Sequence, residues 1–322
     1  MKIFFHIQTL YRKYLPLITG LLFIFLLLTN SVNSVFLVNT GLSTWYKHMI
    51  PSLFPFMVLS GILLRSGISR QLSNLFFPLL GRIFRLSSDC IYIILMGFLC
   101  GFPMGASIIA DSLSLRKITH REAELLFSFC NNIGPIYFIS FVTIACPYYP
   151  LWITLTLMYA IPLLYGIFLR YTFYRDIPVI HSHHNISVKQ TQTVNYLRAI
   201  EESTEKALTS ILTLGAYMII FNVLQLPLYN TFYKTPENIL CILKGLIEIN
   251  SGISAIKMHP ELFPVVYSVF LPFGGLCCIF QTYAMIKTTP LSLRLYLIHK
   301  ILQTFCTVLL YILPAIAKIG DI

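Results

Sequence analysis

Residues 97–105 read GFLCGFPMG, and residues 244–252 read KGLIEINSG. Both stretches lie inside long apolar segments, yet neither suits a helix that crosses a membrane. Glycine and proline weaken the first as a helix, and the second carries two charged side chains, each of which costs about 2.5–3.5 kcal/mol or more in the bilayer centre. Irregular backbone at that depth is tolerated only where protein or water surrounds it. We therefore expect two re-entrant helical hairpins, over residues 90–112 and 238–257.

The composition places the chain in a membrane. Of its 322 residues, 57% are apolar and only 11% are Lys, Arg, Asp or Glu, whereas a soluble domain has about 25% charged residues. So little polar surface argues against a cytosolic enzyme, a DNA-binding domain and a disordered chain. We expect an all-α polytopic membrane protein, with about seven transmembrane helices in addition to the two hairpins.

The basic residues indicate the topology. If every apolar segment crossed the membrane, the basic loop 170–206 would lie outside, which the positive-inside rule disfavours. With two hairpins and a cytoplasmic N-terminus, the cytoplasmic side holds every Lys and Arg except Lys47, Lys234, Lys244, Lys257 and Lys318. The net charge of +11 then reports topology and requires no nucleic acid partner. Residues 71–88 interleave Phe and Leu with arginines, and we expect an amphipathic helix there on the same surface.

The two hairpins also reveal a repeat. After a first helix, the order span, hairpin, span, span occurs twice, with the hairpins entering from opposite sides. Secondary transporters with such inverted repeats bind solutes near the midplane, between broken helices. The alternative is a bundle in which one or both hairpins cross fully. The expected parts are an N-terminal transmembrane helix (1–44), a first repeat (45–169), a cytoplasmic linker (170–205), a second repeat (206–316) and a C-terminal tail (317–322).

The first half offers two motifs that suit a binding site. Glycine lets a backbone approach a ligand closely, and Pro135 lacks the N–H that would bond back to Asn131, so the helix should break there and free polar backbone groups. The alternative is a kinked helix with tight glycine packing and Asn–backbone hydrogen bonds. The candidate binding residues of this half are Gly101, Pro103, Gly105, Ser107, Asn131 and Asn132.

In the second half, Glu248 is the acidic residue near the middle of an apolar segment. It could coordinate a coupling cation, carry a proton or hydrogen-bond a substrate group. Alternatively it is a structural partner of Lys244, which is four residues earlier and on the same helical face. Taken alone, Gln281 would more often form an ordinary interhelical hydrogen bond than contact a ligand. The candidate binding residues of this half are Glu248, Asn250, Ser251, Gly274, Gly275 and Gln281.

No enzyme signature stands out. The chain lacks GxSxG, HExxH, Walker and GxGxxG patterns in a strand-to-helix context, and no pair of carboxylates is placed for acid–base work. The histidines at 181, 183 and 184 are interpreted as part of a solvated loop. We expect no catalytic residue, no metal and no cofactor. The expected partners are a small-molecule solute and the lipid bilayer. Formation of a homo-oligomer is possible as well.

Several spaced blocks of sequence resemble one family over roughly residues 45–310. They are PSLFPF at 51–56, GFPMGA at 101–106, EAE at 122–124 followed by SFCNN at 128–132 and Gly134-Pro135, GLIEINSG at 245–252, and FGG at 273–275 followed by Gln281. In this combination the chain resembles the YlbJ-type sporulation integral membrane proteins of the nucleoside-recognition, or Gate-domain, superfamily.

The resemblance implies a role in endospore formation. Members of that family are thought to move dipicolinic acid across the outer forespore membrane, and they are distantly similar to concentrative nucleoside transporters. In that similar fold, two hairpins and two broken helices enclose the solute. The alternatives are a transporter of nucleosides or other small solutes, and a sporulation scaffold that transports nothing.

The implied solute sets a chemical requirement. Dipicolinate is a planar dianion, and we expect the N-terminal N–H groups of half-helices at the hairpin tips to suit its carboxylates. The sequence shows no obvious buried arginine for it, and a charged Glu248 facing the solute would repel it.

Overall fold

The computed structural model describes residues 2–147, 151–178, 196–230 and 235–319, and all regular structure in them is helical. This agrees with the expected all-α class. The expected linker falls partly outside the described residues, at 179–195, together with His181, His183 and His184. Residues 320–322 of the expected tail also fall outside them.

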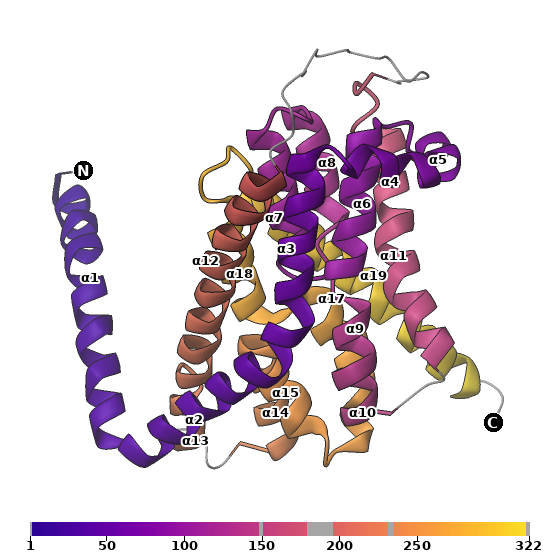
Figure 1. Cartoon of the computed structure of the whole chain (residues 1–322). Coiled ribbons are helices and arrows are strands. Elements are labelled where there is room, and N and C mark those ends of the chain that lie inside the picture. Colours follow the sequence, from indigo (N-terminus) through magenta and orange to yellow (C-terminus); the bar gives the residue numbers. More distant parts are fainter. Residues whose placement is uncertain (1, 148–150, 179–195, 231–234, 320–322) are drawn as a thin grey trace.

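The N-terminal region is divided differently from the prediction. Helix α1 (Lys2–Thr29) stands apart from the rest of the molecule (Figure 1), and a bend at Asn30 leads into α2 (Ser31–Thr44). From there a π-helical turn, η1 (Trp45–Met49), runs directly into α3 (Ile50–Ser66). The expected boundary after residue 44 therefore lies inside one helical run of 36 residues.

Residues 69–84 form a short helical arm at one end of the molecule (Figure 1). Its parts are α4 (Ser69–Phe76), a π-helical turn η2 (Phe77–Gly81) and α5 (Arg82–Phe84). Leu75 and Leu79 are exposed, as expected of an amphipathic helix at an interface. The arm is bent by 98° from the helix that follows it.

Both expected hairpin stretches fold as pairs of helices packed against each other. The first consists of α6 (Ser88–Cys100) and α7 (Met104–Ser114), and the hydroxyl of Ser87 caps α6. The second consists of α14 (Glu237–Ile247) and α15 (Ile249–Ile256). Figure 1 places α14 and α15 at the end of the molecule opposite α4 and α5.

Two helical runs are interrupted near the middle of the molecule. In the first, α8 (His120–Phe129) begins with a capping box formed by Thr119 and Glu122. Residues 130–134 are not helical, and the helix resumes as α9 (Pro135–Tyr137), η3 (Phe138–Val142) and α10 (Thr143–Ala145). The break falls where Pro135 was expected to cause one.

The second interrupted run breaks at glycine. It consists of η4 (Pro260–Leu262), α16 (Phe263–Val265), η5 (Val266–Phe270), α17 (Leu271–Phe273) and α18 (Gly275–Ile286). Between α17 and α18, Gly274 has φ +84°, a left-handed conformation that ends α17. The remaining helices are α11 (Leu151–Thr172), α12 (Tyr196–Val223), α13 (Leu226–Asn230) and α19 (Leu293–Ile319).

The number of candidate membrane spans is lower than the expected seven. Within the described residues, five runs are long and apolar enough to cross a membrane, and six if the bent arm and α6 count as one. The break at 130–134 shortens the expected span 123–146 to the helix Pro135–Ala145. The five runs are Ser31–Ser66, Thr154–Thr172, Tyr196–Tyr229, Pro260–Ile286 and Leu293–Tyr311.

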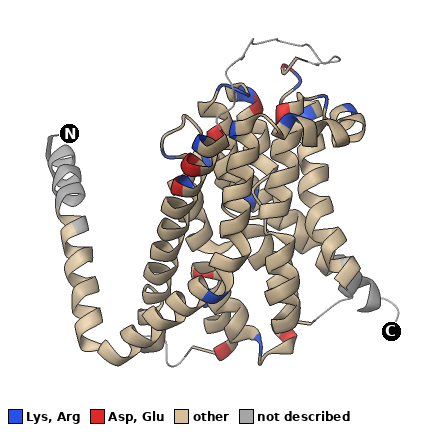
Figure 2. Cartoon of the chain, in the orientation of Figure 1, with Lys and Arg blue, Asp and Glu red and all other residues tan. Residues whose placement is uncertain are grey.

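Charged residues are unevenly distributed. Figure 2 shows Lys and Arg gathered at the end that holds α4, α5 and the start of α8. There Arg121 Nε lies 2.9 Å from Asp176 Oδ2, and this hydrogen-bonded contact lowers the pKa of the Asp176 carboxyl. This segregation agrees with the basic side predicted from the sequence, apart from Lys300, which is described below.

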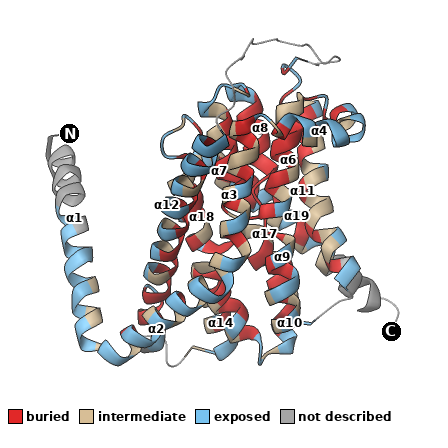
Figure 3. Cartoon of the chain, in the orientation of Figure 1, coloured by how far each residue is buried: buried red, intermediate tan, exposed pale blue. Residues whose placement is uncertain are grey.

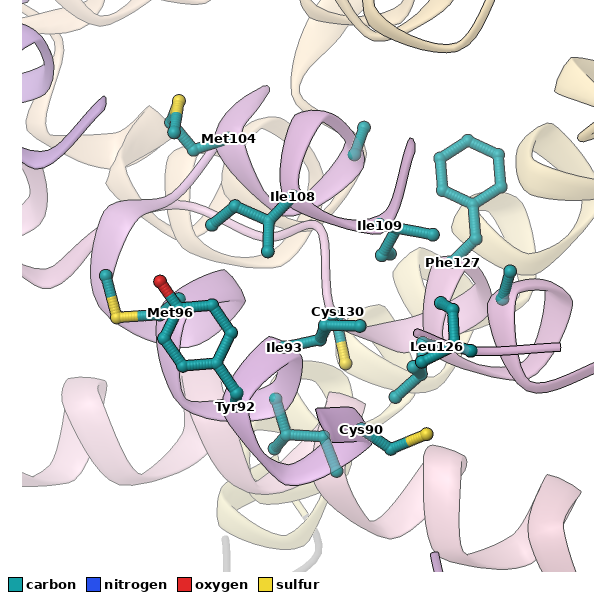
Figure 4. Packing of buried hydrophobic residues seen from close by; sticks show 14 of the residues in the cluster. Cys90, Tyr92, Ile93, Met96, Met104, Ile108, Ile109, Leu126, Phe127 and Cys130 are labelled. Atoms are coloured by element: carbon teal, nitrogen blue, oxygen red, sulfur yellow. The ribbon is translucent and has the colours of Figure 1, made fainter. Parts of the chain in front are cut away.

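The interior is built by close packing. Buried residues gather at the centre of the bundle while many outer faces are exposed (Figure 3), and Figure 4 shows α6, α7 and α8 meeting through side chains such as Tyr92, Ile108 and Leu126. Because lipid tails are as apolar as a protein core, helices in a bilayer associate through tight contact rather than through burial of apolar area. Small residues at helix–helix contacts therefore matter for stability, because they let the helices approach closely.

Gly252 is the sharpest example of such a contact. A Cβ atom added there would lie 2.1 Å from the Cα atom of Gly245, so the two arms of the second hairpin would have to separate. We predict that Gly252→Ala destabilises the protein by about 1–3 kcal/mol, the usual cost of overpacking. Thermal unfolding in detergent measures this. Gly20→Ala is the control because nothing lies within 4 Å of its added Cβ, and an equal midpoint for the two variants would contradict the assigned packing.

Candidate functional site

A cavity lies where the hairpin tips meet the two interrupted runs. It holds about 570 Å³ of empty space, its open mouth included. Both halves of the chain contribute to its wall, together with α3 and α12. Representative lining residues are Phe102, Tyr137, Glu248, Asn250 and Gln281.

Glu248 is the connection between the two arms of the second hairpin. Its backbone is extended, and its carboxylate accepts hydrogen bonds from the backbone N–H groups of Asn250 (3.1 Å) and Ser251 (2.8 Å) and from the Asn250 amide (2.6 Å). Glu248 is thus the N-cap of α15, where a negative charge is favoured by the helix dipole. The alternative of a pair with Lys244 is wrong, because the Lys244 ammonium lies over the Tyr229 ring, 4.6 Å from its centroid.

Asn250 and Ser251 join the second hairpin to its neighbours. The Tyr137 hydroxyl donates a hydrogen bond to Asn250 Oδ1, which connects α15 to the first interrupted run at the cavity wall. Ser251 Oγ donates to Asn222 Oδ1 on α12 over 2.7 Å. Asn250 therefore belongs to the cavity, whereas Ser251 anchors the hairpin to α12.

Asn131 is completely buried and connects three helices. Its Oδ1 accepts from the backbone N–H of Ala106 in α7 (3.3 Å), and its Nδ2 donates to Thr282 Oγ1 and the Tyr296 hydroxyl, both at 3.0 Å. Asn131 therefore occupies the start of α7, as Glu248 occupies the start of α15. The expectation that these hairpin N–H groups await a carboxylate is not met in this structure.

The polar backbone groups freed at the first break have side-chain partners. Gln303 donates to the carbonyl of Ser128 (2.6 Å), Asn132 to that of Phe129 (2.6 Å) and the Tyr159 hydroxyl to that of Ile133 (3.0 Å). Buried carbonyls need such partners. Side chains of α11 and α19 therefore hold the break open.

The predicted glycines bring the hairpin tips against the breaks. A Cβ on Gly101, where φ is +83°, would lie 2.3 Å from the backbone nitrogen of Gly134, and one on Gly105 would lie 2.3 Å from the Cys130 carbonyl oxygen. Likewise a Cβ on Gly275 would meet the Gly245 carbonyl oxygen at 3.0 Å. Each tip thus touches the break of its own half, backbone to backbone.

The predicted residues therefore separate into groups. Three of them, Glu248, Asn250 and Gln281, line the central cavity. Ser107 lines a different cavity, towards the charged end, and Ser251 contacts α12. The others form or support the tip–break contacts behind the wall: Gly101, Pro103, Gly105, Asn131, Asn132, Gly274 and Gly275.

The cavity that Ser107 lines continues the central one along α3 and α12. Leu53 and Leu214 line the central cavity, and Met57 and Ser210, about one helical turn further on, line the second. Polar groups surround the second cavity, including an ion pair between Lys206 of α12 and Asp111 of α7. The two cavities therefore follow one another along α3 and α12, and the second lies nearer the charged end.

Lys300 is buried, which was not predicted from the sequence. The topology count put it on the cytoplasmic side, but it is 1% exposed, and its Nζ donates to Asn132 Oδ1 over 2.9 Å. The signal was available in the spacing of α19, whose buried polar residues recur at three- and four-residue intervals and so form one stripe. They are Tyr296, Lys300, Gln303 and Thr307, with His299 beside Lys300. Sequence reasoning also missed Phe102 and Tyr137 as lining residues.

The described residues contain no group of three His, Cys, Asp or Glu side chains that could hold a metal ion. What the cavity presents is two aromatic rings, two amides and one carboxylate already engaged by its own helix. Such a wall can stack on a planar molecule and hydrogen-bond its edges.

Comparison with known proteins gives one informative similarity. The sporulation integral membrane protein YlbJ of Bacillus subtilis (strain 168) is 36% identical over 106 residues, which are 33% of this chain. The aligned part spans about a quarter (26%) of the length of that relative. No protein-family profile matches the chain, and no solved structure matches it significantly.

The connections of Asn131 can be tested directly. Asn131→Ala leaves the Ala106 N–H without its partner and removes the link to Thr282 and Tyr296. We predict a loss of stability of at least about 1–3 kcal/mol, the cost of one buried polar group without a partner. Thermal unfolding in detergent checks this against Asn39→Ala, a change at an exposed position of α2. Equal unfolding midpoints would contradict the structural role given to Asn131.

Proposed function

We propose that this protein is a membrane transporter that moves a small aromatic carboxylate by alternating access. The observation that carries the proposal is the central cavity, whose wall combines both hairpin tips with residues of both interrupted runs. Such a site, built from two halves of a chain, can open to either side when one half moves against the other. We propose no enzymatic reaction.

The membrane arrangement is part of this proposal. We infer that α6–α7 and α14–α15 are re-entrant hairpins that enter from opposite sides and relate the two halves as an inverted repeat. Their position at opposite ends of the bundle supports it (Figure 1), as does the charge at one end (Figure 2). The charged end, and with it the N-terminus, would then be cytoplasmic.

The solute class follows from the cavity and the relative. The name of the B. subtilis relative refers to sporulation and to an integral membrane protein. Together with the family resemblance, this supports action in the outer forespore membrane and dipicolinic acid as the solute. The aromatic rings of Phe102 and Tyr137 suit a planar ring, and Glu248, engaged as a helix cap, does not present a free carboxylate.

A nucleoside is the second candidate. The amides of Asn250 and Gln281, close to aromatic rings, would also suit a neutral base. Uptake by purified protein in liposomes distinguishes the candidates. We expect labelled dipicolinate to accumulate above protein-free liposomes, and uridine not to. Uptake of neither solute would remove the transporter proposal in this form.

Glu248 supplies a variant for the same assay. Glu248→Ala removes the acceptor for two N–H groups of α15 and the amide of Asn250, so the hairpin tip loses its shape at the cavity. We predict at least a ten-fold decrease in the initial rate of dipicolinate uptake. Glu237→Ala, at the exposed start of α14, should retain uptake near that of the unaltered protein. An undiminished rate in Glu248→Ala would argue against this cavity as the site.

A replacement of the linker distinguishes a transporter from a scaffold that transports nothing. Suppose that the protein is a scaffold that recruits partners through the polar residues 179–195. Replacing them with a neutral linker of the same length should then lower the dipicolinate content of the spores. A transporter should keep its uptake rate in liposomes within about two-fold, because the described residues that line the cavity belong to the hairpins, the interrupted runs, α12 and the run from η1 to α3. Normal uptake combined with normal spores would support transport, and loss of spore dipicolinate despite normal uptake would support the scaffold.

A further inference from the structure

Lys300 is a buried cation with little to balance its charge. Its side chain is 1% exposed on α19, and its Nζ has one hydrogen-bond acceptor, Asn132 Oδ1, although an ammonium group has three donors. In the part of the chain that the structure describes, no carboxylate pairs with it. Its other neighbours are the faces of the Phe102 and Tyr296 rings, 4.9 and 5.8 Å from Nζ to the centroids.

These neighbours compensate the charge only in part. The Asn132 amide supplies one acceptor, and the two ring faces supply cation–π attraction. An ammonium group taken out of water is stable only when its charge and its donors are matched by partners. The site therefore has free hydrogen-bond donors and lacks a counter-charge, and an anion would supply what is missing.

The position of Phe102 shows where that anion would come from. Phe102 stands at the tip of the first hairpin, and its ring both lines the central cavity and contacts the Lys300 ammonium. The ring of Phe102 is therefore a contact that Lys300 shares with the wall of the cavity. The hairpin N–H groups are already occupied, since Asn131 bonds to α7 and Glu248 to α15.

We propose that Lys300 binds a carboxylate group of the transported solute and makes the cavity selective for anions, with Phe102 as the side chain that yields to the incoming ring. The inference rests on the proposed transport function. It assigns to the ligand a carboxylate beside an aromatic ring, because the solute then replaces both the ring contact and the missing counter-charge of Lys300.

Binding to purified protein in detergent tests this, with pyridine-2,6-dicarboxylate as the anionic probe and its neutral diamide as the matched control. Calorimetry should show at least a ten-fold weaker affinity of Lys300→Gln for the dicarboxylate and a change of less than two-fold for the diamide. Lys244→Gln controls for loss of a lysine charge elsewhere, because Lys244 contacts the Tyr229 ring, and it should bind like the unaltered protein.

Asn132→Asp keeps the proposal testable if Lys300→Gln does not fold. It places a carboxylate where Asn132 Oδ1 now accepts the Lys300 hydrogen bond, so the lysine acquires an internal counter-ion, while the hydrogen bond that Asn132 Nδ2 donates to the Phe129 carbonyl is lost. The new ion pair offsets part of that loss, and the folded variant should bind the dicarboxylate at least ten-fold more weakly and the diamide within two-fold of the unaltered protein.

The outcomes distinguish the two proposals. Dicarboxylate binding of equal strength in all folded variants would overturn the role of Lys300 and leave transport of the dicarboxylate intact. Equal losses for dicarboxylate and diamide would also overturn it, because they would indicate a structural role. Failure of the unaltered protein to bind or take up the dicarboxylate would remove the proposed function and the inference together.

Discussion

A helix that breaks inside an apolar bundle must find partners for its backbone polar groups, and this requirement shapes the centre of the molecule. Water is excluded there, so each unpaired N–H or C=O costs free energy. Side chains from α11 and α19 donate hydrogen bonds to carbonyls of the first break, and Asn131 accepts one from an N–H group at the start of α7. The second hairpin supplies its own cap with Glu248. These bonds tie α7, α11 and α19 to the first break and give the tip of the second hairpin its shape beside the cavity.

The places where the chain departs from simple spans could be predicted from the sequence because the causes are local. Gly101 and Pro103 interrupt the first hairpin, Pro135 breaks the first run, and the expected pairs of helices are present. The number of spans could not be predicted as well. Hydropathy counts apolar residues in a window, whereas the bend at Asn30 and the break at 130–134 determine how long each helix is.

The site was predicted by segment more accurately than by residue. All four expected segments reach the cavity, yet most of their polar and glycine residues are used in contacts between the segments. Residue type indicates that a side chain is unusual in an apolar run, but it does not indicate which neighbour will engage it. Lys300 illustrates this: the topology rule counts a lysine by its position along the chain, whereas its partner Asn132 lies 168 residues away in the sequence.

The glycine contacts between tips and breaks have a consequence for how the protein can evolve. They join backbone to backbone at Gly101, Gly105 and Gly275, so the frame around the cavity depends on few side chains. The chemistry of the cavity depends on a different set, including Phe102, Tyr137 and Gln281. Under the proposed transport function, substitutions in this second set would change the preferred solute while the frame stays constant. A few exchanges in the lining would then let paralogues of one scaffold differ in the solute they carry.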